Sequence, residues 1–186
     1  MKRLLGLMVV VMAVTGIIGL AYGGDTDSIQ IKVTMVTNIE VDIADAEYNF
    51  GILNSGETSD PAAYVTQVQN TSADNREDWR LNLTDPANWA AITLGSPGPE
   101  QFMLMAQFAD NSGTKVTWDS TNHALSTSLQ YCSLDKFGNN VYGECGLDVP
   151  TTTDTRNLWF RLTMPSESAF PGTEQTIAVT VTASAG

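Results

Sequence analysis

The stretch DWRLNLT, Asp78–Thr84, alternates between apolar and polar residues. Its apolar residues are Trp79, Leu81 and Leu83, and the polar residues between them are Arg80 and Asn82. Successive side chains of a β-strand point to opposite faces of its sheet, so a period of two indicates a half-buried strand. We therefore expect a strand whose three apolar side chains lie in the core and whose two polar side chains lie outside it.

Segments of similar character recur on both sides of this stretch. They are SIQIKVTMVTNIEVDI (28–43), AYVTQVQN (63–70), QFMLMAQFA (101–109), TKVTW (114–118), STSLQYC (126–132), NLWFRLTM (157–164) and EQTIAVTVTA (174–183). QFMLMAQFA is apolar on both faces, as in a strand that is covered on both sides. Clusters of Gly, Pro, Asn and Asp separate the segments and predict turns.

Only one segment carries a signal for a helical turn. In DPANWAAI (85–92), Asp85 could cap the turn and Pro86 could occupy its first position. Many short strands without long crossover helices indicate an antiparallel all-β protein. The sequence thus predicts a single antiparallel two-sheet sandwich, of Ig-like or jelly-roll kind, as one domain over residues 24–186.

A corner formed by aromatic residues and glycines lies at AEYNFGILNSGET (46–58). Tyr48 and Phe50 precede Gly51, and Gly56 closes the next turn. Glycine allows backbone conformations that other residues avoid, so we expect the chain to turn here. An aromatic side chain at such a corner would close one end of the sandwich without any ligand.

The order of these features resembles prokaryotic cell-surface β-sandwich domains. Phe50-Gly51, the turn at Gly56, the strand AYVTQVQN and then DWRLNL are similar to WxL-type surface domains and to small secreted subunits of extracellular fibres. Trp79-Arg80-Leu81 matches the WxL tripeptide once. The final segment LWFRLTMPSESAFPGTEQTIAVTVTA is similar to how such domains end. The resemblance implies an exported structural or adhesive role rather than catalysis.

Residues 1–23 carry the pattern of a signal peptide. Lys2 and Arg3 precede an apolar run from Leu4 to Leu20, and the small residues of AYG (21–23) follow it. An uncleaved membrane anchor is the alternative, because the run is nearly long enough to span a bilayer. With cleavage, we expect a secreted protein, extracellular or at the cell surface, that has no membrane contact in its mature form.

The charge balance narrows the class of partner. The chain has 9 basic and 21 acidic residues, a formal net charge of −12, and residues 1–23 contain two of the basic residues. Nucleic acids and anionic membranes require a basic face, so neither is an expected partner. Cations remain compatible with this charge.

The two cysteines, Cys132 and Cys145, lie in one segment, CSLDKFGNNVYGEC. An isolated pair in an exported chain predicts a disulfide, here closing a surface loop. Closing a loop of this size stabilises by roughly 3 kcal/mol in the chain-entropy model. A redox-active pair is normally closer in sequence, and a zinc site lacks ligands because His123 is the only histidine.

No pattern of residues indicates an enzyme or a cofactor. His123 lies near Ser120 and Ser126, but its segment is typical of an exposed loop, so we expect a surface histidine. Acid pairs such as Glu77-Asp78 occur by chance at this composition. Calcium is the one ligand that remains compatible with the sequence. ADNRED (73–78) and the turn around Asp110 and Gly113 offer the carboxylate and carbonyl oxygens that calcium prefers. Neither segment has the spacing of an EF-hand.

The segment Ser28–Met35 is the candidate contact between subunits. The alternating apolar residues there are Ile29, Ile31, Val33 and Met35. After a flexible lead from Gly24, such a strand could pair with the sheet edge of a neighbouring copy and hold a filament or surface layer together. An ordinary first strand in its own sheet is the alternative for this segment. A monomeric adhesion or carbohydrate-binding module, with Trp89, Trp118 and Tyr142 as an aromatic platform, is the alternative for the whole protein.

Overall fold

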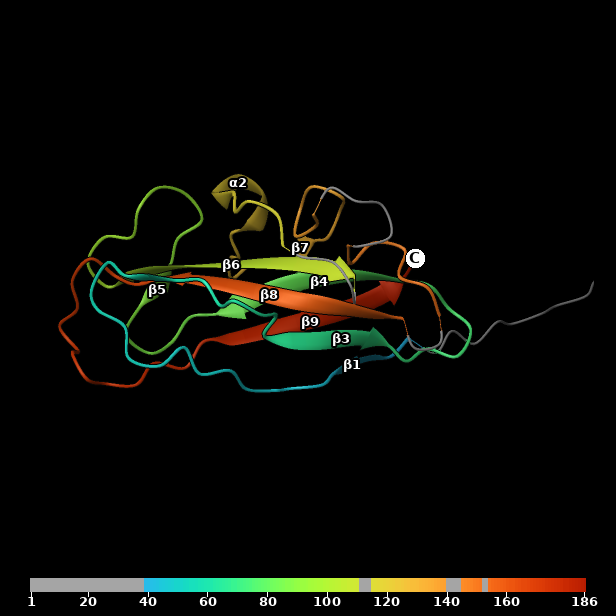
Figure 1. Cartoon of the computed structure of the whole chain (residues 1–186), viewed down its shortest axis with the longest axis horizontal. Coiled ribbons are helices and arrows are strands. Elements are labelled where there is room, and N and C mark those ends of the chain that lie inside the picture. Colours follow the sequence, from blue (N-terminus) through green and yellow to red (C-terminus); the bar gives the residue numbers. More distant parts are fainter. Residues whose placement is uncertain (1–38, 111–114, 140–144, 152–153) are drawn as a thin grey trace, which may run out of the picture. The chain divides into compact units, whose positions relative to one another are not determined.

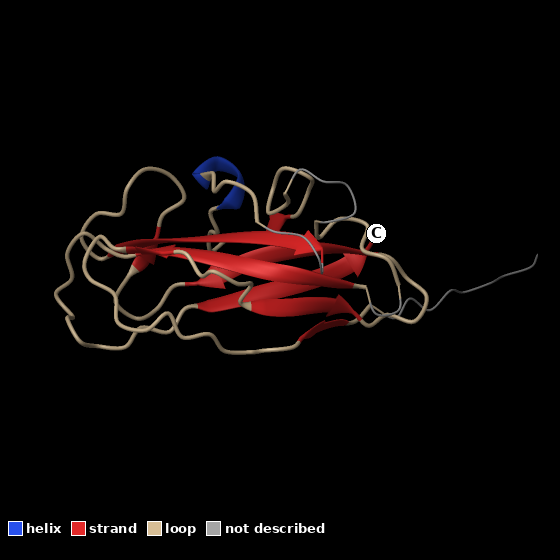
Figure 2. Ribbon diagram, viewed as in Figure 1, coloured by secondary structure: helices blue, strands red, loops and turns tan. Residues whose placement is uncertain are grey.

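The computed structural model describes residues 39–110, 115–139, 145–151 and 154–186. These residues are nearly all strand and loop (Figures 1 and 2). In chain order the elements are β1 (Val41–Ile43), β2 (Thr58–Ser59), β3 (Thr66–Asn70), β4 (Glu77–Thr84), β5 (Ala90–Ala91), β6 (Gln101–Asp110), α2 (Ser120–His123), β7 (Gln130–Tyr131), β8 (Thr155–Thr163) and β9 (Ala178–Ala185). The all-β prediction is confirmed for this part of the chain.

The strands form two sheets. Sheet A has the order β1-β3-β8-β6-β5, and β2 pairs with β8 beyond the end of β3. Sheet B has the order β7-β4-β9. The pairings are antiparallel except that of β5 with β6. The strands that pair are distant in sequence, so each sheet requires most of the chain to be in place.

One hydrophobic core receives side chains from both sheets. Its fully buried members include Val68 on β3, Phe102 and Phe108 on β6, and Leu158 on β8, all from sheet A. Sheet B contributes the apolar residues of β4, which are 0–1% exposed: Trp79, Leu81 and Leu83. Arg80 and Asn82 are only partly buried. The predicted faces of the stretch DWRLNLT are therefore correct.

β6 is buried on both faces, as its sequence predicts. β8 pairs along one edge of β6, and irregular segments bond to the other edge. The backbone of Leu125 donates to Leu104, and that of Phe108 donates to Phe137. The side chain of Gln107, on the face turned away from the core, accepts a hydrogen bond from the backbone of Val116. The edge of β6 opposite β8 is thus closed by β5 and by loop backbone.

Two segments lack their predicted element altogether, and the predicted strand 126–132 is reduced to the two residues of β7. In 114–118, Lys115–Trp118 form no strand, because their polar groups bind side chains such as Gln107 and Asp60 rather than a neighbouring strand. The predicted helical turn in 85–92 is also wrong. Asp85 accepts a hydrogen bond from the backbone of Ala91, six residues later, and the chain enters β5 instead of a helix.

The aromatic corner turns as predicted. Gly51 and Gly56 have φ angles of 77° and 71°, a region that favours glycine over residues with a Cβ. Phe50 packs against the core, and Tyr48 contacts it edge-on with a centroid separation of 4.9 Å. This arrangement explains the corner by packing alone.

We expect Trp79→Ala to lower the free energy of unfolding by about 3–5 kcal/mol, because it removes a fully buried indole from the centre of the core. Asn82→Ala, on the opposite face of the same strand, should change it by less than about 0.5 kcal/mol. Chemical denaturation of both variants measures the difference. Similar values for the two would contradict the assignment of the faces.

Candidate functional site

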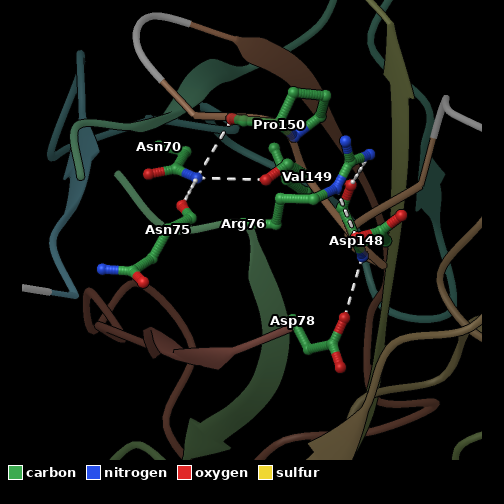
Figure 3. Close-up of polar contacts among 7 residues, drawn as sticks. All are labelled: Asn70, Asn75, Arg76, Asp78, Asp148, Val149 and Pro150. Atoms are coloured by element: carbon green, nitrogen blue, oxygen red, sulfur yellow. Dashed lines mark hydrogen bonds and ion pairs between the residues drawn. The ribbon is translucent and has the colours of Figure 1, made fainter. Parts of the chain in front are cut away.

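Polar side chains gather where β4 begins, and we call this group the anchor cluster: Asn70, Ser72, Arg76, Glu77 and Asp148. Asn70, at the end of β3, is fully buried. Its amide nitrogen lies 3.0 Å from the carbonyl oxygens of Asn75, Val149 and Pro150, and Figure 3 shows the side chain pointing toward them. Its carbonyl oxygen accepts from the backbone of Ser72 at 2.8 Å. One side chain thus connects the turn after β3 to the distant segment at Val149 and Pro150.

The exposed part of the cluster is an ion pair on the loop before β8. Arg76 pairs with the carboxylate of Asp148 and donates to its backbone carbonyl at 2.8 Å. Asp78 accepts from the backbone nitrogen of Asp148, also at 2.8 Å (Figure 3). The Arg76 side chain is 51% exposed, so the ion pair orients the loop more than it stabilises the fold.

Glu77 is the buried acid of the cluster and has no exposure to solvent. One carboxylate oxygen accepts from the indole nitrogen of Trp79 at 2.8 Å. The other accepts from the hydroxyl of Ser72 and, at 2.9 Å, from the backbone nitrogen of Glu40. These donors all belong to the protein, and together they satisfy both oxygens of the carboxylate. The group therefore acts as a structural joint and not as a catalytic acid.

The anchor cluster holds the start of β1 and the end of β9 in place. The backbone nitrogen of Glu40, just before β1, donates to Glu77, and its carbonyl oxygen accepts from the backbone nitrogen and the hydroxyl of Thr71. The backbone of Gly186, just after β9, donates to Arg76 at 2.9 Å. The start of β1 and the end of β9 therefore meet at one point, beside the start of β4.

The two sides of the sheets differ in how well they are covered. On the β7 side, β4 bonds through its backbone to Ser126, Cys132, Gly146 and Val149. On the other side, the outer edge of β9 has no strand partner among the described residues. The inward side chains of β9 are only partly buried, although the β4 residues opposite them are fully buried. These inward residues of β9 are Val179, Val181 and Ala183.

The predicted contact residues Ile29, Ile31, Val33 and Met35 lie outside the described residues, as does the predicted signal peptide, 1–23. Within the described ranges, no helix is both long and apolar enough to cross a bilayer.

Among the described residues, no group of three acidic, His or Cys side chains is placed to hold a metal ion. The calcium hypothesis therefore has no candidate site among them. In ADNRED, Glu77 points into the core and Asp78 binds loop backbone. The carboxylates therefore do not converge on one point. The second candidate turn includes Asn111 and Gly113, which lie outside the described residues.

Cys132 and Cys145 are both free thiols in the structure, and both are buried. They are neighbours in space: a Cβ at Gly146 would lie 3.1 Å from the Cys132 sulfur. Burial raises the pKa of both thiols, and each thiol's nearness to the acid Asp78 acts in the same direction. Both cysteines are buried, and the disulfide that closes a surface loop stays a prediction.

His123 does not lie on the surface, contrary to its predicted place. It is the last residue of α2 and is 3% exposed. Its Nδ1 accepts from the backbone of Asp119 at 3.0 Å, which leaves Nε2 to donate to the carbonyl of Gly138 at 3.2 Å. Neither serine near it in sequence is bonded to the ring. Burial lowers the pKa of His123, although the nearby Asp119 and the Gly138 bond oppose the shift and Lys136 adds to it.

The suggested aromatic platform does not assemble from Trp89 and Trp118. Trp89 packs toward the core near Phe102, at the start of β6, and its nitrogen donates to Ser168. The Trp118 ring contacts the His123 ring edge-on. His123 in turn contacts Gln107, near the other end of β6. Tyr142 lies outside the described residues.

A cavity of about 290 Å³ lies beside α2. Its lining residues are Thr93, Leu94, Ser120, Thr121, Ser126, Gln130 and Lys136. The Lys136 ammonium group donates to the carbonyls of Thr121 and Ala124 and lies 4.7 Å from the Phe137 ring centre. Burial lowers the pKa of Lys136. Two of the donor hydrogens of this ammonium group are therefore already used within the protein.

Sequence reasoning missed the role of Glu77, but a signal for it exists. Glu77 has the same parity as Trp79 and Leu81, so the alternation that begins at Trp79 already places its side chain on the inward face. An acid at an inward position predicts a buried carboxylate that needs donors. Asn70 shares the inward parity of Val68 on β3, but its partners are backbone carbonyls that no sequence pattern identifies.

For the cysteines, we expect protein isolated from its native source under non-reducing conditions to be lighter by two hydrogens than the reduced protein, as intact-mass analysis would show. In the reduced, folded protein both thiols should react slowly with an alkylating reagent, because burial disfavours the thiolate. Unfolding should restore a normal rate. Two free thiols in freshly isolated native protein would contradict the disulfide, and rapid alkylation of the folded form would contradict the burial.

For His123, we expect stability to fall when the pH is lowered from about 7.5 to about 5.5. The pKa in the folded state lies below the ordinary value of about 6.5, so the unfolded state takes up the proton first. The contribution is therefore complete above that value and is lost as the pH falls from it through the lower pKa of the folded state. Denaturation curves of His123→Asn should show a shallower pH dependence than the wild type. Equal slopes would contradict this account.

No protein-family model matches the chain, and no curated protein matches it either. The resemblance to surface β-sandwich domains thus rests on the residues quoted for it. The function has to be argued from the geometry of the sheets and their edges.

Proposed function

We propose that the protein is an exported structural subunit of an extracellular filament or cell-surface layer, built on an antiparallel two-sheet sandwich of Ig-like or jelly-roll kind. The sandwich assignment is supported by the single core to which both sheets contribute. Export is supported by the signal-peptide pattern of residues 1–23 and by the acidic composition.

The observation that carries this proposal is the long outer edge of β9, on the side away from β4. Eight residues of β9 pair with β4 on one side, and the described part of the chain offers no strand for the other side. Exposed strand edges expose unpaired backbone donors and acceptors, and proteins that remain monomeric usually protect them. An unprotected edge of this length suits a protein that assembles by adding strands.

The joining segment in this proposal is Ser28–Met35, donated to a neighbouring subunit. Its apolar residues Ile29, Ile31, Val33 and Met35 would cover a partly buried row on the acceptor. Each such side chain contributes roughly 1.5–3 kcal/mol when it is fully buried. Four of them, together with the hydrogen bonds of a strand pair, would suffice to hold subunits together.

Electron microscopy and sedimentation of the purified protein test the proposal. We expect the protein, after removal of residues 1–23, to form filaments or sheets, and deletion of Gly24–Met35 to give particles of single-subunit size. Val33→Asp should also abolish assembly, because it places a charge on the apolar face of the segment. Lys32→Ser, on the polar face, is the matched control and should still assemble. A protein that stays monomeric at every concentration, or a deletion variant that forms normal filaments, would contradict the proposal.

A monomeric binding module is the second candidate, and one group of residues favours it. The Lys115 ammonium group lies 5.9 Å from the ring centre of Trp118 and 5.2 Å from that of Trp159. Tyr64 contacts Trp159 edge-on and is 42% exposed. Aromatic rings beside polar groups are a common surface for sugars. Binding of polysaccharides by a protein that remains monomeric, lost in Tyr64→Ala, would favour this candidate.

A further inference from the structure

We propose that the outer edge of β9 is the acceptor site and that it binds Ser28–Met35 of a second copy in antiparallel orientation. This inference rests on the proposed function and adds to it the identity of the acceptor strand, the direction of the pairing and the origin of the segment.

The hydrogen-bond pattern of β4 shows which backbone groups of β9 face outward. Residues with odd numbers on β4 bond away from β9: Glu77 to Val149, Trp79 to Gly146 and Cys132, and Leu83 to Ser126. Its even-numbered residues therefore bond to β9, in pairs such as Arg80 with Thr182 and Asn82 with Thr180. The odd-numbered residues of β9 must then direct their N–H and C=O groups to the open edge: Val179, Val181, Ala183 and Ala185.

The same odd-numbered residues direct their side chains toward the core. They lie opposite the inward residues of β4, with Val181 facing Leu81 and Ala183 facing Trp79. They are partly exposed while their β4 neighbours are fully buried, so water reaches the core boundary along this edge. An added strand with apolar residues at every second position would bond to the edge and cover this row in a single step.

β9 also differs from the other outer strand on this side, β1. β1 is three residues long and carries Asp42 at its centre, with Glu40 and Asp45 nearby. A short strand with charged residues is a typical protected edge. β9, with the sequence AVTVTASA, is eight residues long and contains neither a charged residue nor a proline. Of the two edges, β9 is thus the one suited to pairing.

The segment fits this edge in length and period. Ser28–Met35 has as many residues as β9, and its apolar residues have odd numbers. An antiparallel register that sets Ile31 opposite Ala183 and Val33 opposite Val181 keeps all inward positions aligned. The outward positions would then set Thr34 opposite Thr180 and Gln30 opposite Ser184, with no acidic residue in either row.

A segment of the same chain would need a fully stretched link to Glu40 to take this orientation. Glu40 is held beside Glu77, which lies opposite Ala185 at the end of β9. In the antiparallel register Met35 would lie near Val179, about 20 Å away along the strand at roughly 3.4 Å per residue. The five residue steps from Met35 to Glu40 reach at most about 18 Å when fully extended. Antiparallel pairs outnumber parallel ones about two- to three-fold, which favours a second copy as the donor.

Cysteine cross-linking between separately labelled chains tests the proposal. Two variants are prepared, one carrying Thr34→Cys and one carrying Thr180→Cys, then mixed, assembled and oxidised. We expect a cross-linked dimer of the two chains. Ser184→Cys is the matched control for Thr180→Cys, since both residues lie on the outward face of β9, and it should link poorly to Thr34→Cys. Wild-type protein treated in the same way shows any background from Cys132 and Cys145.

A second variant tests the edge without a cross-link. Val181→Pro removes an outward N–H and leaves the ladder to β4 intact, so it should fold as a monomer and fail to assemble. Val181→Ala keeps the N–H and should still assemble. A link from Thr34→Cys to Ser184→Cys instead, a link only within one doubly substituted chain, or normal assembly of Val181→Pro would overturn the inference. In the last case assembly persists, so the proposed function would survive, whereas absence of any assembly by the wild type would remove both.

Discussion

The buried carboxylate of Glu77 is the constraint on which the rest of the molecule depends. Moving a carboxylate out of water is costly unless donors replace the lost solvent. Here the donors come from three places: the indole of Trp79 in the core, the hydroxyl of Ser72 after β3, and the backbone of Glu40 before β1. The carboxylate is satisfied only when all three segments are in place. Sheet A and sheet B are therefore joined by a polar contact as well as by the hydrophobic core.

This joint explains why the two sides of the molecule differ. On the β7 side, loops bond directly to β4 and β6, and Phe137, Leu125 and Val149 belong to the buried core. On the opposite side, the anchor cluster joins the start of β1 to the end of β9. The inward side chains along the outer edge of β9 are partly exposed. In the proposed assembly, this less covered side would receive the neighbouring subunit.

The sequence predicts the strands better than it predicts their surroundings. Alternation at Trp79, Leu81 and Leu83 is a local pattern, and the structure confirms both its faces. The errors concern residues whose partners are distant: His123 is buried because Gly138 and Asp119 bind its ring, and Asp85 bonds to Ala91 instead of capping a helix. Propensity describes a segment by itself, so it does not detect such contacts. The candidate acceptor edge likewise required the pairing of β9 with β4 to be known.

The register of β9 has a consequence for the timing of assembly. The hydrogen bond from Ser184 to Asp78 joins residues 106 positions apart, and β9 is the last strand of the described chain to be synthesised. Contacts of such long range form late and slowly, because the intervening chain must first be ordered. In the proposed assembly, a newly exported chain would thus possess its apolar segment before it possesses a complete acceptor edge. Folding would act as a checkpoint, since only a finished subunit could receive the next one.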